Sequence, residues 1–321
     1  MHFFLRKTIM TLSITTAQKD IELEYTLQST RDQKLLSMVI PTGRIQEKVL
    51  DLLGRIGLDF SRSGRSYRPS ESNPGVRAKM LKAQNIPELV ALGRHDCGFS
   101  GYDWIRERRA DVVELLDLGF DPVRIVAAVP EKLACLQGNR YRDLGRPLVI
   151  ASEYRELTAN YIEQSGFDGI YLQTFGATEA LPPEDADMIV DNTATGTTLQ
   201  DNRLVIVDEL LRSTTRFICN RQALADPARK RLLNEMVMLM ESSLRARAKV
   251  LLEMNVSSAD LERIVKDLPC MKAPTVCQLY GEQGYAVKVA VPKADVPALV
   301  PKLVALGARD ILEYRLERIV I

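Results

Sequence analysis

The stretch from residue 188 to residue 199 restricts the fold more than any other part of this sequence. A short apolar run ends in Asp191 and passes into a loop of threonines around Gly196, after which a further apolar residue begins another segment. A strand that delivers such a loop to the edge of a sheet is typical of phosphate-binding turns. The backbone N–H groups of residues 195–198 can converge on a phosphate there, and the glycine permits its close approach.

Asp191 can accept hydrogen bonds from sugar hydroxyls, so the loop is suited to a phosphorylated ribose. The sequence contains no Gly-x-x-x-x-Gly-Lys-Ser/Thr motif and therefore lacks the lysine that usually meets β- and γ-phosphates. A nucleotide bound by this chain need not be hydrolysed. The alternative is a threonine-rich turn that only caps a helix, because threonine and aspartate are common N-caps. The preceding apolar strand and Asp191 favour the phosphate interpretation.

The order of strands, glycine turns and helices predicts an α/β body of two lobes. The pattern first occurs over residues 35–57, and a second block begins at residue 147. We expect lobe I at residues 31–125 and 206–226 and lobe II, with the phosphate loop, at 126–205. Ligands in such sheets bind outside the carboxyl ends of the strands, which is where Arg44 follows the first strand.

A separate domain follows this body. An amphipathic helix over residues 227–249 links the two, and residues 250–321 have the periodicities of strand, helix, two strands, helix and strand. This order predicts a ferredoxin-like (ACT-like) α+β domain, a type of module that often binds effectors in biosynthetic enzymes. The first 30 residues form an extension to which the pattern assigns no role.

Composition excludes several classes of function. The net charge is only +1, which gives no reason to expect nucleic acid or a membrane surface as a partner. Five scattered cysteines without Cys-x-x-Cys spacing indicate reduced thiols in a cytoplasmic protein, and two histidines are too few to favour zinc. Any metal chemistry would use oxygen ligands, as Mg²⁺ does. No run approaches the roughly 18 apolar residues that span a bilayer, and no secretory signal is evident.

Several motifs, taken in order, resemble those of ATP phosphoribosyltransferase in its long form. The motifs that accompany the threonine loop are Gly43-Arg44, Ile86-Pro87, Asp96 through Asp103, Phe175 through Ala180, Ser213 through Arg216 and Lys272 through Val276. The resemblance covers about residues 35–321. It implies lobes like those of periplasmic binding proteins, a C-terminal regulatory domain that binds histidine, and a homo-hexamer.

The resemblance also implies a reaction. The family transfers the 5-phosphoribosyl group from phosphoribosyl pyrophosphate to N1 of ATP, giving 1-(5-phosphoribosyl)-ATP and pyrophosphate, in the first step of histidine biosynthesis. Because N1 is already a lone-pair nucleophile, catalysis is mostly positioning and charge stabilisation. Mg²⁺ is the implied cofactor, histidine and AMP are the implied inhibitors, and no nucleic acid or membrane partner is implied.

Site residues follow from the matching motifs. Thr195, Gly196, Thr197 and Thr198 would hold the 5′-phosphate, and Asp191 and Glu179 would be the catalytic carboxylates that face the ribose and its developing positive charge. The residues expected at ATP or pyrophosphate are Gly43, Arg44, Lys82, Gly101 and Asp103. Asp191 is also the candidate metal contact and Thr275 the candidate effector contact. Two simpler alternatives are that Glu179 is a helix-start acid and Lys82 a solvated lysine at a strand end.

Two motifs depart from the family pattern. Thr42 stands where many relatives have lysine, and Gln84 lies in a stretch, Lys82 to Pro87, where they have Arg-x-Arg-Asp-Ile-Pro. The loop over residues 61–75 could compensate as a basic flap through Arg62, Arg65 and Arg68, although its composition is typical of a solvated loop. The lost charges leave open a non-catalytic paralogue that binds nucleotide or phosphoribosyl groups, whereas retention of both catalytic carboxylates favours the enzyme.

Overall fold

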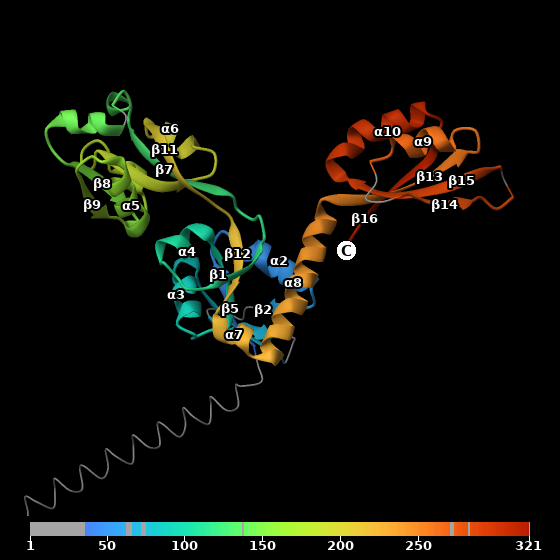
Figure 1. Ribbon diagram of the computed structural model, residues 1–321, viewed down its shortest axis with the longest axis horizontal. Coiled ribbons are helices and arrows are strands. Elements are labelled where there is room, and N and C mark those ends of the chain that lie inside the picture. The colour runs from blue at the N-terminus through green and yellow to red at the C-terminus, as the bar shows by residue number, and fades with distance from the viewer. Residues whose placement is uncertain are drawn as a thin grey trace, which may run out of the picture.

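The computed structural model describes residues 36–61, 66–71, 75–136, 138–269, 273–281 and 283–320. In these residues the chain forms two α/β lobes, a long helix and a C-terminal domain (Figure 1). The expected extension over residues 1–30 lies outside the described residues, as do Arg62, Arg65 and Lys272.

Lobe I is built on a five-stranded sheet of order β4-β1-β5-β12-β6. The strands are β1 (Leu36–Thr42), β4 (Val76–Lys82), β5 (Cys97–Gly101), β6 (Val113–Asp117) and β12 (Thr215–Cys219), with a short pair β2 (Phe60–Ser61) and β3 (Ser70–Glu71) beside them. The helices are α2 (Gln46–Arg55), η1 (Ala83–Asn85), α3 (Ile86–Ala91) and α4 (Tyr102–Glu107). β1 is parallel to β4 and β5, whereas β12 is antiparallel to β5 and β6. Strand β1, second in this order, is almost continuously apolar, because one of its faces packs on α2 and the other on α3.

Lobe II has a second five-stranded sheet of order β11-β7-β10-β8-β9. The strands are β7 (Val123–Pro130), β8 (Leu148–Ser152), β9 (Gly169–Gln173), β10 (Met188–Thr193) and β11 (Leu204–Ser213). The helices are η2 (Glu131–Leu133), η3 (Gly138–Leu144), α5 (Arg155–Ser165), η4 (Thr178–Ala180) and α6 (Thr197–Asp201). β8, β9 and β10 are parallel, and β7 is antiparallel to its neighbours β10 and β11.

The boundary between the lobes differs from the expected one. The chain passes from lobe I to lobe II between β6 and β7 and returns between β11 and β12. Residues 206–213, expected in lobe I, belong to lobe II because β11 pairs with β7 as far as Ser213. Two irregularities in that pairing, at Ile206/Asp208 and at Glu209/Leu211, interrupt the alternation of apolar residues. The sequence pattern therefore predicts a strand over residues 203–207 only, which is shorter than β11.

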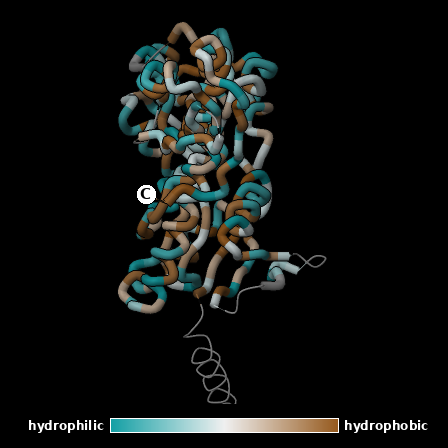
Figure 2. Tube along the Cα trace, turned by 90° about the vertical axis from the view of Figure 1, so that its right-hand side faces the viewer, coloured by the Kyte–Doolittle hydropathy of each residue, from teal (hydrophilic) through white to brown (hydrophobic). Residues whose placement is uncertain are grey.

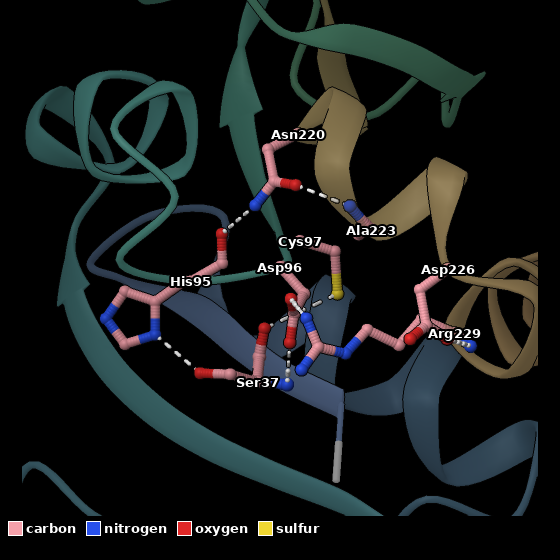
Figure 3. A network of polar contacts seen from close by, with 8 residues as sticks. All are labelled: Ser37, His95, Asp96, Cys97, Asn220, Ala223, Asp226 and Arg229. Carbon is pink, nitrogen blue, oxygen red and sulfur yellow. Dashed lines mark hydrogen bonds and ion pairs between the residues drawn. The ribbon is translucent and has the colours of Figure 1, made fainter. Parts of the chain in front are cut away.

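Helix α8 (Pro227–Arg247) follows the short helix α7 (Arg221–Ala225) and packs on lobe I through the buried Met236 and Met240. A polar network fixes its start (Figure 3). Asp226 accepts a hydrogen bond from the Arg229 N–H at 2.9 Å, and Arg229 Nη1 donates to Asp96 Oδ1 at 2.9 Å. The other oxygen of Asp96 accepts from the backbone N–H of Ser37 at 2.7 Å. The helix is therefore anchored to β1 and to the residue that precedes β5.

The C-terminal domain has the predicted ferredoxin-like order. Its elements are β13 (Lys249–Ser257), α9 (Leu261–Asp267), β14 (Thr275–Gln278), β15 (Gly284–Pro292), η5 (Lys293–Asp295), α10 (Val296–Ala305) and β16 (Arg309–Arg315). The antiparallel sheet has the order β14-β15-β13-β16. The last strand ends earlier than expected, because residues after Arg315 return to α8, where the Ile319 N–H donates to the Ser242 carbonyl at 3.0 Å.

Apolar and hydrophilic residues are interspersed along the described chain in every part of the molecule (Figure 2). No helix among the described residues is long and apolar enough to cross a membrane. The four described cysteines, Cys97, Cys135, Cys219 and Cys277, are free thiols, as the sequence predicted.

Candidate functional site

A cavity of about 460 Å³ lies where the two lobes meet. Lobe I contributes the carboxyl ends of β1, β4 and β5, and lobe II contributes the residues that follow β8 and the end of β10. The cavity lining contains Gly43, Arg44, Lys82, Gly101 and Asp103, all five residues predicted to meet ATP or pyrophosphate. The fold thus brings three separate sequence motifs to one place.

Two cations at strand ends face this cavity. β1 ends at Thr42, and Gly43 turns the chain with φ of 90°, in the left-handed region that favours glycine. Arg44 follows in the turn, and Lys82 is the last residue of β4. Both side chains are exposed, and neither forms an ion pair with any described residue. They are therefore available to an anionic ligand.

Asp103, unlike Arg44 and Lys82, is buried and hydrogen-bonded within the protein. It is 5% exposed, and both carboxylate oxygens are hydrogen-bonded: Oδ1 accepts from Ser213 Oγ at 2.7 Å and Oδ2 from the Tyr154 hydroxyl at 2.8 Å. A Cβ at Gly101 would lie 2.1 Å from Asp103 Oδ1, so only glycine lets the carboxylate fold back in this way. Asp103 lines the cavity but is engaged with lobe II through Tyr154.

The two predicted catalytic carboxylates lie within electrostatic range of each other. Burial, with a smaller contribution from the charges of Glu179 and Glu153, raises the pKa of Asp191 to about 6, although hydrogen bonds from Asn192 oppose the rise. β10 continues through Asp191 to Thr193, rather than ending before the carboxylate. Glu153, which sequence reasoning missed, accepts a hydrogen bond from Gln84 Nε2 of lobe I at 3.1 Å.

The threonine loop follows Asn192, which lines the cavity, but none of residues 195–198 is itself part of the lining. Thr195, Thr197 and Thr198 are exposed, and Gly196 has φ of 86°. The Gly196 N–H donates to Thr193 Oγ1 at 2.9 Å, so the expected convergence of all four N–H groups on a phosphate is wrong for this one. Thr197 and Thr198 begin α6, where backbone N–H groups have no partner within the helix. The Thr197 N–H makes only a long contact of 3.4 Å, with Thr195 Oγ1, which an anion could replace, so both N–H groups remain candidate donors.

The comparisons with known proteins point to one family. The family described as ATP phosphoribosyltransferase matches residues 82–242, and the family described as HisG, C-terminal domain, matches residues 246–318. The ATP phosphoribosyltransferase of Thermodesulfovibrio yellowstonii is 38% identical over 297 residues, which cover 89% of this chain and 99% of that protein. The chain belongs to the ATP phosphoribosyltransferase family.

Further relatives support the assignment. The ATP phosphoribosyltransferase of Chlorobium chlorochromatii is 37% identical over 295 residues, covering 90% of this chain and 99% of that protein. A chain in the solved ATP phosphoribosyl transferase (HisG:HisZ) complex of Thermotoga maritima is 26% identical, with a TM-score of 0.55 over 64% of this chain and 99% of that one. The predicted family and its reaction, the transfer of a phosphoribosyl group to ATP in the first step of histidine biosynthesis, are confirmed.

One predicted residue lies away from the cleft, and two aromatic residues of the cleft were not predicted. The candidate effector residue Thr275 is exposed on β14, opposite Lys288 of β15, and lies in the C-terminal domain rather than in the cleft. The cleft also contains Tyr154 and Trp104, whose rings stack with centroids 4.6 Å apart. The signal that could have found Tyr154 is its position two residues after the end of β8, at the edge of the sheet where ligands bind.

Proposed function

We propose that the cleft between the lobes is the site where phosphoribosyl pyrophosphate and ATP react. The observation that supports this proposal is the single cavity lined by Gly43, Arg44, Lys82, Gly101 and Asp103 and bordered on lobe II by the end of β10. Exposed cations on one side and carboxylates on the other suit a substrate whose pyrophosphate leaves as its ribose becomes positively charged.

The proposed roles follow from charge and reach. The N–H groups of Thr197 and Thr198 hold the 5′-phosphate, while Asp191 and Glu179 face the ribose hydroxyls. The bond from the anomeric carbon to pyrophosphate breaks and a new bond forms from that carbon to N1 of ATP. The two carboxylates stabilise the positive charge that develops on the ribose during this exchange. Arg44 and Lys82 hold the departing pyrophosphate. Asp103 acts in this scheme by joining the lobes.

Mg²⁺ is proposed as a cofactor that arrives on the substrate phosphates. Among the described residues, no three acidic, cysteine or histidine side chains are grouped closely enough to hold a metal ion by themselves. Burial raises the pKa of Asp191, and the negative charges of Glu179 and Glu153 add to the rise, an effect that a nearby cation would offset. Bound to pyrophosphate, the ion would neutralise the leaving group. Asp191 is the side chain we propose to contact it.

Two further properties are proposed from the family relationship. The C-terminal domain would bind histidine and thereby inhibit the reaction, with AMP as a second inhibitor, and six chains would form the working assembly. The exposed Thr275 on β14 is the residue we propose for the effector contact. Light scattering with and without histidine would test the assembly, because a particle smaller than six chains under both conditions contradicts it.

The decisive test is the near-ultraviolet absorbance of product formation with ATP, phosphoribosyl pyrophosphate, Mg²⁺ and inorganic pyrophosphatase. We expect a rise that requires both substrates, is abolished by EDTA and falls at least about 100-fold in Asp191→Asn, since the variant loses charge at the reacting sugar. Asp185→Asn, which changes an exposed carboxylate of the same lobe, is the matched control. Normal activity of Asp191→Asn would refute its proposed role.

A further inference from the structure

Several polar contacts between the lobes involve one short segment, residues 153–157, which follows β8 and includes the first turn of α5. From lobe I, Gln84 donates to the carboxylate of Glu153 at 3.1 Å. The carboxylate of Glu107, also from lobe I, accepts from the backbone N–H groups of residues 156 and 157 at 3.0 to 3.1 Å and so caps α5. This segment is one place where lobe II is held against lobe I, and Ser213 at the end of β11 is another.

Tyr154 lies at the centre of that segment and belongs to a continuous chain of hydrogen bonds. Its hydroxyl donates to Asp103 Oδ2 at 2.8 Å and accepts from Asn192 Nδ2 at 3.2 Å. Asn192 Nδ2 also donates to Asp191 Oδ1 at 3.1 Å. Each donor has an acceptor, with carboxylates at both ends, so the four side chains fit together in only one arrangement of donors and acceptors.

The tyrosine in this chain of hydrogen bonds has little freedom, whereas Asn192 is exposed and is fixed only by its hydrogen bonds. Tyr154 is 1% exposed, and its ring stacks on Trp104 at 4.6 Å between centroids. Asn192 uses both hydrogens of its amide, one for the tyrosine hydroxyl and one for Asp191. If the hydroxyl is removed, the amide of Asn192 loses the acceptor that fixes its rotation, and its bond to Asp191 loosens with it.

We propose that Tyr154 is a positioning residue for phosphoribosyl transfer, which acts through Asn192 to fix the orientation of the Asp191 carboxylate while lobe I holds the tyrosine through Asp103. The proposal rests on the role proposed above for Asp191. It explains why Asp103, a cleft carboxylate, has no free oxygen to offer a ligand. It also makes the alignment of a lobe II catalytic group depend on contact with lobe I.

The test is Tyr154→Phe, which keeps the ring on Trp104 and removes only the hydroxyl. We expect kcat to fall about 10- to 100-fold with KM for either substrate changed less than about threefold, because a small misplacement of a catalytic group affects the transition state most. The acid limb of kcat against pH should move to higher pH. Loss of the ordered Asn192 side-chain donor removes one of the two hydrogen bonds that lower the pKa of Asp191, and the bond from the Asn192 N–H at 2.7 Å remains.

Two comparisons separate positioning from general damage. Tyr161→Phe removes another hydroxyl of lobe II, one that contacts Asp208 at 3.4 Å away from the cleft, and should leave kcat and the pH profile unchanged. Asn192→Ala breaks the chain at its next link without exposing Asp103 and should reproduce the kinetics of Tyr154→Phe. Because Tyr154 acts through Asp191, adding Tyr154→Phe to Asp191→Asn should cost no further activity.

The outcomes are distinct. If Tyr154→Phe folds and keeps the kcat and pH profile of the wild type while Asp191→Asn is inactive, the positioning role is wrong and the proposed active site stands. If Asn192→Ala is fully active, or if the losses in the double variant multiply, Tyr154 does not act through Asp191. Full activity of Asp191→Asn would instead overturn the proposed function itself. Should Tyr154→Phe fail to fold, Asn192→Ala alone decides.

Discussion

Strand β5 has a buried aspartate near each end, and the two are held in opposite ways. Asp96, which precedes the strand, is paired with a cation, Arg229, inside the body formed by lobe I and α8 (Figure 3). Asp103, two residues past the strand, is paired with two neutral hydroxyls, those of Ser213 and Tyr154, at the contact with lobe II. Only 8% and 5% of their surfaces are exposed, so burial does not explain the difference.

The contrast separates a permanent contact from an exchangeable one. Breaking a buried ion pair leaves an uncompensated charge, which costs several kcal/mol. Burial raises the pKa of Asp96, whereas the Ser37 N–H and the charge of Arg229 oppose the rise. A hydroxyl that leaves a carboxylate carries no charge, so its loss leaves no buried cation without a partner. We infer that the Asp96 end of the strand serves stability and the Asp103 end serves the reaction.

The largest effect is expected at the ion pair. Arg229→Ala leaves Asp96 buried without its cation, and we expect the free energy of unfolding to fall by about 3 kcal/mol. Urea unfolding measures it. The matched control is Arg231→Ala on the same helix, whose side chain is 77% exposed, where the change should stay below about 0.5 kcal/mol. Equal effects of the two variants would contradict the comparison.

Two isosteric variants should each affect one property, activity for Asp103 and stability for Asp96. In Asp103→Asn the tyrosine hydroxyl loses a charged acceptor, which weakens the bond between the lobes, and kcat/KM should fall about tenfold with little change in stability. In Asp96→Asn we expect about 2 kcal/mol less stability, because Arg229 loses its counter-charge, and normal kinetics for the folded enzyme. Steady-state kinetics and urea unfolding on both proteins are needed. If Asp96→Asn is the kinetically impaired variant, the division between the two ends is wrong.

The smallest effect concerns Asp191, at the far end of the chain of hydrogen bonds from Asp103. Its pKa is raised to about 6 in the folded protein, so the folded state binds the proton more tightly than the unfolded chain does. This carboxylate therefore costs stability above pH 6, and the cost disappears as the pH falls from 6 to 4. Asp191→Asn should be about 1 kcal/mol more stable than the wild type at pH 7.5 and equal to it near pH 4.

The control for that prediction has the opposite sign. The pKa of Asp187 is lowered by its hydrogen bond to Arg146, so its contribution is stabilising at neutral pH and is lost in acid. Asp187→Asn should cost about 0.5 kcal/mol at pH 7.5, since its partner is largely exposed. Thermal unfolding at several pH values measures both variants. A destabilised Asp191→Asn at pH 7.5 would show that the carboxylate is not strained by its surroundings.

Much of this molecule was predictable from local patterns, and the exceptions share a cause. The ferredoxin-like domain and the strands before Gly43 and the threonine loop follow from periodicity and glycine placement, which are local signals. The hydrogen bonds of Asp103 could not be predicted from local signals, because Tyr154 and Ser213 are 51 and 110 residues away in sequence. The role of Gly98 does not follow from local patterns either. A Cβ there would lie 2.8 Å from the Ile86 side chain, so packing rather than ligand approach requires that glycine.

The order of strands in lobe I has a consequence for biosynthesis of the protein. β12 lies between β5 and β6 in the sheet, yet it follows the whole of lobe II in the sequence. During translation the facing edges of β5 and β6 remain unpaired until residue 219 has emerged, while all five strands of lobe II are already available to one another. We expect a chain that stops at residue 213 to contain a protease-resistant lobe II and a protease-sensitive lobe I. Such unfinished chains would be the ones most prone to aggregate.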